Sequence, residues 1–441
     1  MSTAPHSATL DTIVALCKRR GFVYPTADVY GGLNGVYDFG HLGTLMKRNI
    51  KRAWLQSLDA SGQEMLQFDG ALLGPEAVWK ASGHIDNFHD PMIDCTFCKK
   101  RFRADDIDIT KACPACGTKN SWTEVREFNL MFKTQLGATV EQSSVAYLRP
   151  ETAQTIFANF KNIITTNRVK IPFGVAQIGK AFRNEITPKQ FLFRVREFEQ
   201  MELEFFCKPT ESDSFFDYWT VQRAAFFTTI GINSAHIRIR PHEKGELAHY
   251  SKQCNDVEYE FPFGWKELEG VAHRGNFDLT QHSTHAKKDL AVFDEDTQES
   301  YMPHVVECSI GIGRLFLALL FDAYAEDVVE GETRVVLKLH PRIAPITAAI
   351  LPLVKKLSEP AHALYLDLKK QGFSIVFDET GSIGKRYRRC DEIGTPWCFT
   401  YDFESETTQT VTVRNRDTLA QERIATDQVA TYLRTMLDSS L

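Results

Sequence analysis

The chain has 441 residues, more than one hydrophobic core usually holds, so two or three domains are expected. Hydrophobic residues make up 43% and charged residues 24%, which is ordinary for a soluble globular protein. The formal net charge of -6 excludes a globally basic nucleic-acid-binding protein, so any RNA contact has to come from local basic patches.

The N-terminal region predicts no export signal. Met1 to Leu10 lacks a basic segment followed by an apolar core, and no apolar run is long enough to span a membrane. We therefore expect a cytoplasmic protein without a membrane partner.

The first elements are short helices and strands. Ser7 to Arg20 predicts a helix that ends at Gly21. The apolar positions of Leu42 to Leu58 follow a helical period and predict an amphipathic helix. A strand is expected near Glu64 to Phe68, and Pro75 ends a second apolar stretch.

Four of the ten cysteines form two close pairs. Cys95 and Cys98 are separated from Cys113 and Cys116 by a 14-residue spacer. This spacing predicts a Zn²⁺ ion held by four thiolates in a small insertion over residues 92–120. Such a closed shell indicates a structural metal, and the alternative is four unrelated buried cysteines.

The stretch from Tyr147 to Gly313 predicts an antiparallel sheet with few helices, hence an α+β fold. Alternation along Phe193 to Phe206 gives one polar face and one apolar face. The polar face carries Arg194, Arg196, Phe198, Gln200 and Glu202, whereas Met201, Leu203 and Phe205 suit a core. Arginine forks suit a triphosphate, although a solvated sheet face with interspersed charges fits equally well.

A third segment, His304 to Arg314, runs from a strand into an apolar helix expected at Ile312 to Ala325. Glu307 and Ser309 share one strand face, and Arg314 falls in the first turn of the helix. A helix N-terminus with an arginine predicts an anion site. The alternative is a glycine-rich turn with a surface arginine.

A boundary is expected near Val328 to Thr333, which divides the chain into residues 1–330 and 331–441. Strands and helices alternate after it, so a separate α/β domain is predicted. A basic cluster in this domain, with Tyr387 and Trp397 nearby, suits a single-stranded RNA loop, or else it is a solvated basic face. The cluster consists of Lys385, Arg386, Arg388 and Arg389.

These segments resemble the three signature motifs of the class II aminoacyl-tRNA synthetases. Leu42 to Pro75 is similar to the first motif, Arg183 to Phe198 to the second, and Gly311 to Arg314 to the third. Finer matches resemble the dimeric glycyl type, and they cover nearly the whole chain: Tyr30 to Gly43, Ser82 to His84, Tyr147 to Gln154, Ala176 to Glu202, Glu267 to Gly270, and Asp378 to Pro396.

The resemblance implies a homodimer that activates glycine with ATP and Mg²⁺, transfers it to tRNA(Gly), and reads the anticodon with its C-terminal domain. It assigns catalysis to Arg183 and Arg314. The implied ATP site also contains Asn184, Glu185, Phe193, Arg194, Val195, Arg196, Glu197, Phe198, Glu267, Leu268, Gly311, Ile312 and Gly313. The implied glycine site contains Arg103, Glu151, Phe198, Glu199, Gln200, Met201, Glu202, Glu307, Cys308, Ser309, Ile310 and Gly311.

Two rival hypotheses are a class II paralogue that charges another acceptor or serves as a regulatory subunit, and a zinc-dependent nucleic-acid-binding protein without catalysis. The chain departs from the family pattern at His41, Thr155, Asn276 and Cys308, of which Cys308 stands where a proline is usual. None of these changes removes an expected phosphate or ammonium contact, and Cys308 is not expected to be catalytic.

Overall fold

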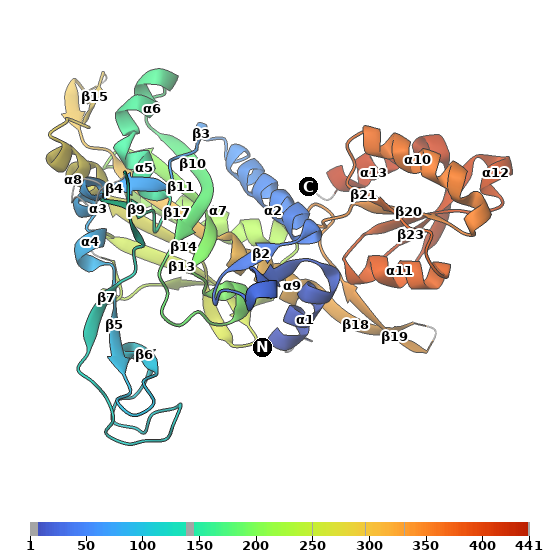
Figure 1. The fold of residues 1–441 in the computed structure, drawn as a ribbon. Helices are drawn as coiled ribbons and strands as arrows, with labels where there is room; N and C mark the ends of the chain where they lie inside the picture. The colour runs from blue at the N-terminus through green and yellow to red at the C-terminus, as the bar shows by residue number, and fades with distance from the viewer. Residues whose placement is uncertain (1–7, 138–144, 249, 296, 330, 440–441) are drawn as a thin grey trace.

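The computed structural model describes residues 8–137, 145–248, 250–295, 297–329 and 331–439 (Figure 1). Its centre is a seven-stranded sheet in the order β12-β13-β14-β17-β11-β10-β3. Neighbouring strands are antiparallel except for the parallel pair of β10 and β3. The predicted antiparallel sheet is therefore confirmed. Its strands are β3 (Met65–Phe68), β10 (Phe173–Phe182), β11 (Glu197–Cys207), β12 (Ile237–Pro241), β13 (Gln253–Phe261), β14 (Gly264–Gly275) and β17 (His304–Gly311).

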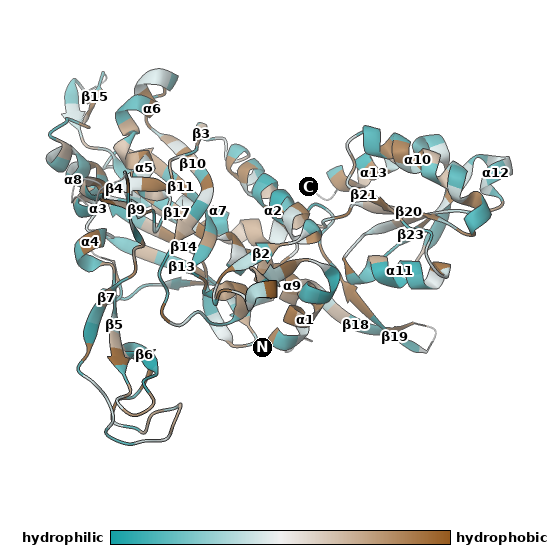
Figure 2. Ribbon diagram, viewed as in Figure 1, coloured by the Kyte–Doolittle hydropathy of each residue, from teal (hydrophilic) through white to brown (hydrophobic). Residues whose placement is uncertain are grey.

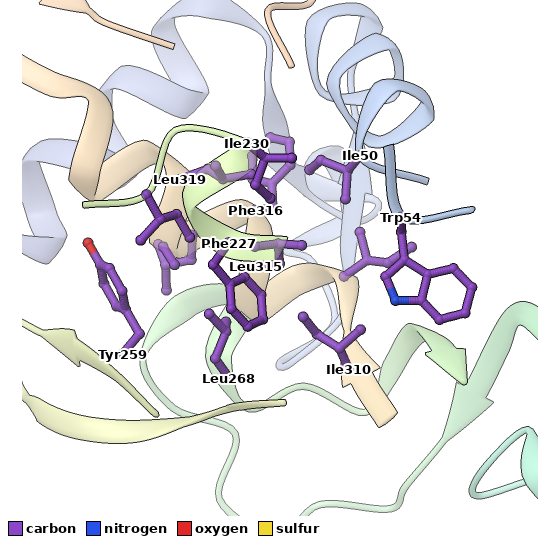
Figure 3. Packing of buried hydrophobic residues seen from close by; sticks show 14 of the residues in the cluster. Ile50, Trp54, Phe227, Ile230, Tyr259, Leu268, Ile310, Leu315, Phe316 and Leu319 are labelled. Carbon is purple, nitrogen blue, oxygen red and sulfur yellow. The ribbon is translucent and has the colours of Figure 1, made fainter. Parts of the chain in front are cut away.

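The main hydrophobic core fills one face of this sheet. Met201, Leu203 and Phe205 of β11 point into it, as the alternation along the strand predicts. Figure 3 shows Phe316 of α9 among the side chains of this cluster, between Ile50 and Phe227. The helices that contribute to this core are α1 (Leu10–Arg20), α2 (His41–Asp59), α7 (Ser212–Thr229) and α9 (Ile312–Ala323).

The strand–helix junction at the start of α9 follows from its sequence. Almost every residue of α9 is apolar, and Figure 2 shows it as a largely hydrophobic helix inside the molecule. The helix ends at Ala323, two residues earlier than expected, because Tyr324 begins a strand. The predicted start of α1 at Ser7 lies outside the described residues, and its predicted end at Gly21 is confirmed by a left-handed cap with φ 74°.

The opposite face of the sheet is covered at only one end. A second apolar cluster there joins Phe157, Phe160, Phe173 and Phe206. The covering helices are α5 (Ala153–Ala158), α6 (Phe160–Asn167) and α8 (Phe277–Ala286). Gln200 and Glu202 of β11 and Ser309 of β17 lie on this face and contact one another.

A small three-stranded arm extends from the body (Figure 1). Its strands run in the order β6-β5-β7. Beside it, α3 (Glu76–Ala81), α4 (His84–Asn87) and the sheet β4-β9-β8 support the base. The strands of the two sheets are β5 (His89–Asp94), β6 (Arg101–Arg103), β7 (Arg126–Asn129), β4 (Leu73–Pro75), β8 (Lys133–Gln135) and β9 (Val145–Leu148).

The C-terminal part has its own core around a five-stranded sheet, β21-β20-β22-β23-β24. The elements are β20 (Ala348–Pro352), α10 (Ser358–Lys370), β21 (Ile375–Phe377), α11 (Ile383–Glu392), β22 (Trp397–Tyr401), α12 (Ser405–Thr408), β23 (Thr410–Asn415), β24 (Gln421–Ala425) and α13 (Val429–Asp438). Strands β21, β20 and β22 are parallel, as expected for alternating strands and helices.

The two parts are connected by a hairpin of β18 (Tyr324–Val329) and β19 (Glu332–Leu337). The boundary expected near residue 330 falls between these paired strands, and the C-terminal sheet begins only at Ala348. Arg334 of the hairpin pairs with Asp327 and also with Asp391 of α11. Glu392 of α11 in turn accepts hydrogen bonds from Arg19 and Arg20 of α1.

Across the part of the chain that the structure describes, no helix combines the length and the apolarity needed to cross a bilayer.

Candidate active site

A cavity of about 320 Å³ opens on the uncovered face of the seven-stranded sheet. It joins segments that are far apart in the sequence: the start of β11, the start of α9, and the arm. Thirteen of the residues predicted for the ATP and glycine sites line it: Arg103, Arg183, Glu185, Phe193, Arg194, Val195, Phe198, Gln200, Glu267, Ser309, Gly311, Gly313 and Arg314. Phe88, Asp90, Leu130 and Leu192 complete the wall, and sequence reasoning missed them.

Arg183 follows the last residue of β10 and lies between two aromatic rings. Its guanidinium carbon is 5.3 Å from the ring centres of both Phe88 and Phe198. Its Nε donates to the carbonyl oxygen of Pro150 at 3.1 Å, which fixes the base of the side chain. Arg183 also lines the cavity, where its terminal amino groups are available to a ligand.

Arg194 and Arg314 lie in the same cavity, so the three arginines of the predicted phosphate site converge. Arg194 Nη1 is buried and has no hydrogen-bond acceptor among the described residues. Arg314 Nη1 is 3.0 Å from Glu267 Oε2, and its guanidinium lies 4.6 Å from the ring centre of Phe193. The charge of Arg314 lowers the pKa of Glu267.

The opposite end of the cavity is acidic. Ser309 Oγ donates to Glu202 Oε1 at 2.9 Å, and Gln200 Nε2 donates to the same oxygen at 3.1 Å. Thr152 Oγ1 donates to Glu202 Oε2. Gln200 Oε1 is buried without a donor among the described residues. A free acceptor beside a buried carboxylate suits a small ligand that carries an ammonium group.

Glu307 lies next to this acidic end and pairs with an arginine that sequence reasoning missed. Arg274 Nη1 donates to Glu307 Oε2 at 2.6 Å, while its Nε donates to Asp278 Oδ2 at 2.7 Å. Arg274 is only 1% exposed and lies 3.8 Å from the ring centre of Tyr250. The four-residue spacing from Arg274 to Asp278 was the available signal, but a single pair at this spacing is common on helices.

Burial strongly perturbs the carboxyl groups here. Burial first, and then the neighbouring Glu202 and Glu151, raise the pKa of Glu307 to about 8. Glu204 is completely buried, and neither of its carboxyl oxygens has a hydrogen-bond partner within the described residues. Burial, followed by the charge of Glu307, raises the pKa of Glu204 well above its usual value.

Glu151 behaves differently because it has partners. Burial alone would raise its pKa, but the charge and hydrogen bond of His84 and the charge of Arg274 lower it overall. His84 Nε2 is 3.3 Å from Glu151 Oε2, and Gln154 Nε2 donates to Glu151 Oε1 at 2.9 Å. Glu151 therefore supplies a fixed negative charge behind the acidic end.

Several predicted residues have side chains on the other face of the sheet. Met201, Leu268, Cys308, Ile310 and Ile312 are buried in the main core. Glu199 pairs with Lys47 and Lys51 of α2, and Glu197 pairs with Lys180. None of these seven residues lines the cavity. Six of them belong to strands, in which residues of odd and even position face opposite ways, and Ile312 is the first residue of α9.

Two further predicted ATP residues are held by backbone groups. The guanidinium of Arg196 donates to the carbonyl oxygens of Glu185 and Asn34. The backbone N–H of Asn184 donates to the carbonyl oxygen of Leu130 at 2.7 Å.

The four predicted zinc ligands converge in the arm. Their sulfur atoms all lie within 4.8 Å of one another. Cys95 Sγ is 3.7 Å from Cys116 Sγ, and Cys98 Sγ is 3.8 Å from Cys113 Sγ. A tetrahedral site with Zn–S bonds of about 2.3 Å needs sulfur separations near these values, so the cluster is compatible with zinc.

The arm also carries Arg103 to the cavity. Arg103 Nη1 is 2.8 Å from Asp90 Oδ1, and Nη2 is 2.7 Å from Asp105 Oδ2. Lys189, in the loop between β10 and β11, pairs with Asp106 of the arm at 3.1 Å. The arm thus contacts both the cavity wall and the loop beside it.

The basic cluster of the C-terminal domain is only partly exposed. Lys385 is exposed, but Arg386 is 3% exposed and donates to the carbonyl oxygens of Pro352, Leu353, Asp378 and Gly381. Arg389 pairs with Asp378, and Arg388 donates to the carbonyl oxygen of Val329. Trp397 is buried in the core of this domain. Arg386 and Trp397 thus make contacts within this domain, and Lys385 is the exposed residue of the basic cluster.

Two family models match the chain. The model described as "tRNA synthetase class II core domain (G, H, P, S and T)" matches residues 132–324, and "Anticodon binding domain" matches residues 347–436. These matches agree with the antiparallel sheet and with the separate C-terminal domain.

Curated relatives match over nearly the full length. A protein named glycine--tRNA ligase from Caldanaerobacter subterraneus subsp. tengcongensis is 51% identical, with 97% of this chain and 98% of that protein covered. Proteins of the same name from Geobacillus thermodenitrificans and Treponema denticola are 49% and 48% identical, with 97% and 98% of this chain and 97% of each protein covered.

Among solved structures, a prolyl-tRNA synthetase from Cryptosporidium parvum in complex with halofuginone and AMPPNP is 12% identical. It superposes with a TM-score of 0.68 over 99% of this chain and 77% of that chain. At this identity the similarity shows a shared fold.

Proposed function

The chain belongs to the glycine--tRNA ligase family of class II aminoacyl-tRNA synthetases, and we propose that the cavity described above joins glycine to ATP and passes the glycyl group to tRNA(Gly). One observation carries this proposal. The cavity has a buried, unpaired arginine donor at Arg194 and a buried, unpaired acceptor at Gln200 beside the Glu202 carboxylate. This pattern is complementary to a ligand pair with phosphates at one end and an ammonium group at the other.

ATP would lie along the arginine end. Arg183 would hold the α-phosphate, and Arg194 and Arg314 the outer phosphates, because planar guanidinium groups donate to two phosphate oxygens at once. The Phe198 ring would stack on the adenine. The Arg183 guanidinium lies over the same Phe198 ring, so it would be next to the bound nucleotide. Glu267 would supply a carboxylate that could help to hold a Mg²⁺ ion, whose charge would offset that of the phosphates.

Glycine would occupy the acidic end. Its ammonium group would be held by Glu202, Gln200 and Glu307, with Ser309 fixing the Glu202 carboxylate. A substrate without a side chain offers nothing to grip, so larger amino acids have to be excluded by lack of space. Arg274 was not expected from the sequence, and it would orient Glu307 through the hydrogen bond that it donates to Glu307 Oε2.

The chemistry needs no protein nucleophile. The glycine carboxylate attacks the α-phosphorus and pyrophosphate leaves. The terminal hydroxyl of the tRNA then attacks the carbonyl carbon of glycyl-adenylate and AMP leaves. Orientation and neutralisation of phosphate charge by the arginines account for the rate. Cys308 has no role in this reaction, since it is fully buried in the core on the opposite face.

The four cysteines of the arm would hold a structural Zn²⁺ ion. All four coordination positions would be filled by thiolates, so the metal would stabilise the arm that carries Arg103 and would not bind substrate.

We assign residues 1–330, with the arm at 92–120, to a catalytic domain and residues 331–441 to an anticodon-binding domain, with the β18–β19 hairpin bridging the two. The exposed Lys385 is the residue of the basic cluster best suited to contact RNA.

We further propose a homodimer. Val29 and Tyr30 are 89% and 90% exposed and Leu33 is 58% exposed, although all three are apolar or aromatic. Adjacent exposed apolar side chains of this kind mark interaction surfaces. The mass in solution, measured by light scattering, tests this assignment.

Glycine-dependent exchange of pyrophosphate into ATP, followed by charging of tRNA(Gly), tests the main proposal. We expect both activities, with alanine and serine supporting exchange poorly. Exchange without charging would favour a paralogue with another acceptor, and the absence of exchange would favour a binding protein. The Glu307→Ala variant should lose exchange while keeping its fold.

A further inference from the structure

A second group of metal-ligand side chains lies at the edge of the central sheet, away from the arm. Cys254 and Asp256 of β13 are two residues apart and therefore share a face. Asp256 pairs in register with Arg240 of β12. Just beyond the end of β12, the backbone N–H of His242 donates to the carbonyl oxygen of Cys254 at 2.9 Å. One small area of the sheet therefore brings together His242, Cys254, Asp256 and Arg240.

Three of these residues carry metal-ligand atoms that are close enough together to bind one cation. An imidazole nitrogen of His242, the sulfur of Cys254 and a carboxylate oxygen of Asp256 lie within 4.8 Å of one another. His242 Nε2 is 2.8 Å from Asp256 Oδ2, so two donors already converge. Three protein ligands of this kind, with a fourth position left for solvent, form a common zinc arrangement.

The imidazole of His242 is only partly satisfied. Both of its ring nitrogens are buried, and Nδ1 has no hydrogen-bond partner among the described residues, while Nε2 faces Asp256 Oδ2. Buried polar groups are rarely left without a partner, because their desolvation is then uncompensated. A metal ion bound to the imidazole would supply the missing partner.

The charges around the patch also favour a cation. Glu258 neighbours Asp256 on the same strand, and Glu267 lies opposite Glu258 on β14. These carboxylates attract a divalent ion, which can take the place of the thiol proton of Cys254.

One contact opposes binding. Arg240 Nη2 donates to Asp256 Oδ2 at 2.8 Å, the same oxygen that faces His242. The arginine has other acceptors in Glu246 and Glu258 at 3.0 Å, so it can keep partners if Asp256 turns to a metal.

We propose that His242, Cys254 and Asp256 bind a divalent cation of the zinc class, separate from the four-cysteine cluster of the arm. Nitrogen and sulfur donors select zinc or cobalt over magnesium. On binding, the sulfur–hydrogen bond of Cys254 breaks, a sulfur–metal bond forms and the proton passes to solvent, with no change in oxidation state.

Cobalt added to the full-length protein, with the arm cluster already filled with zinc, tests the proposal. We expect one further equivalent of Co²⁺ to bind, with the near-ultraviolet absorption band of a thiolate ligand and no release of zinc. Cys254→Ser should remove the band, and His242→Ala should weaken binding by at least about tenfold. Failure of wild type to bind this equivalent, or binding that is unchanged in either variant, overturns the site.

A matched pair of arginine variants gives a second test that does not depend on losing a ligand. Arg240→Gln removes the competitor for Asp256 and should tighten Co²⁺ binding several-fold. Arg238→Gln removes the same charge from the same strand, but Arg238 contacts Glu258 and Trp265 and not Asp256, so it should change affinity much less. Equal effects of the two variants would mean that only general charge matters and would contradict the assigned ligand set.

Discussion

Ser309 Oγ donates a hydrogen bond to Glu202 Oε1 at 2.9 Å, and the two residues face each other in register across β11 and β17. The contact joins the strand that follows the second signature segment to the strand that precedes the third, and the two residues are 107 positions apart in the chain. It fixes the carboxylate that would receive the ammonium group of glycine, so it offers the sharpest point at which to perturb substrate binding.

Ser309→Ala should raise the KM for glycine about tenfold and leave the KM for ATP nearly unchanged. A buried carboxylate that loses a donor costs roughly 1–3 kcal/mol, and Thr152 and Gln200 still hold Glu202 in place. Pyrophosphate exchange at varied glycine and ATP measures both constants. The control is Cys308→Ala, at the residue directly before Ser309. Because Cys308 faces the main core, this change should lower thermal stability without altering either KM.

Arg314→Gln should reduce exchange by about 100- to 1000-fold, since it removes a charged donor from the phosphate end of the cavity. Glu267 would also lose its ion pair. Steady-state kcat/KM for exchange is the measurement. Arg434→Gln, in the C-terminal helix α13, carries the same charge change and should leave exchange intact. Equal activity of the two variants would remove Arg314 from the proposed mechanism.

The raised pKa of Glu307 predicts a pH dependence of stability. Its pKa is about 8 in the folded protein, above the ordinary value of 4.5, so the folded state binds more protons between these values. The unfolding free energy should therefore fall as pH rises through this window. Glu307→Gln cannot ionise, and we expect it to remove about 1.4 kcal/mol per pH unit from this slope.

Urea unfolding of the two proteins at several pH values between the ordinary and the raised pKa of Glu307 measures the difference. The other titratable groups that interact with Glu307 remain in both proteins, and they include Arg274, Glu202, Glu204, Glu151, Asp278, Tyr250, Cys254 and Cys308. Parallel slopes for wild type and variant would show that Glu307 is ionised throughout.

Removal of zinc should loosen the arm and spare the body. Cys113→Ser breaks the four-thiolate set, so protease should cut first within residues 95–122 while the central sheet stays resistant. The KM for substrates should also rise, because Arg103 would no longer be held at the cavity. Cys398→Ala, in the C-terminal core, is the matched cysteine change and should keep the zinc content of wild type.

The two ends of the basic cluster should separate RNA binding from folding. Lys385→Gln should weaken tRNA binding and lower the salt dependence by about one ion, with exchange unaffected. Arg386→Gln should instead destabilise the C-terminal domain by roughly 1–3 kcal/mol, because it removes the donors to four carbonyl oxygens. Binding isotherms at several salt concentrations, together with thermal unfolding, distinguish the two effects.

Periodicity was sufficient for the main elements of the fold. The apolar face of Leu42 to Leu58 and the alternation along Phe193 to Phe206 predicted α2 and β11 because both patterns repeat over many residues. The first strand of the hairpin, β18, was missed, since the apolar residues of α9 run into it without a break.

The site was predictable where residues share a strand face and less so elsewhere. Local sequence gives no sign that Arg274 meets Glu307, because that contact depends on the register between β14 and β17. Likewise, the burial of Arg386 follows from the carbonyl groups that close over it, and a run of basic residues looks the same whether buried or exposed.

The strict division of β11 between two faces limits how this enzyme can change. Leu203 and Phe205 pack in the main core, whereas Gln200 and Glu202 lie at the acidic end of the cavity, on the same short stretch of chain. One inserted or deleted residue would exchange the two sets and place carboxylates among phenylalanines. We therefore expect this strand to change during evolution by substitution of residues and not by insertion or deletion.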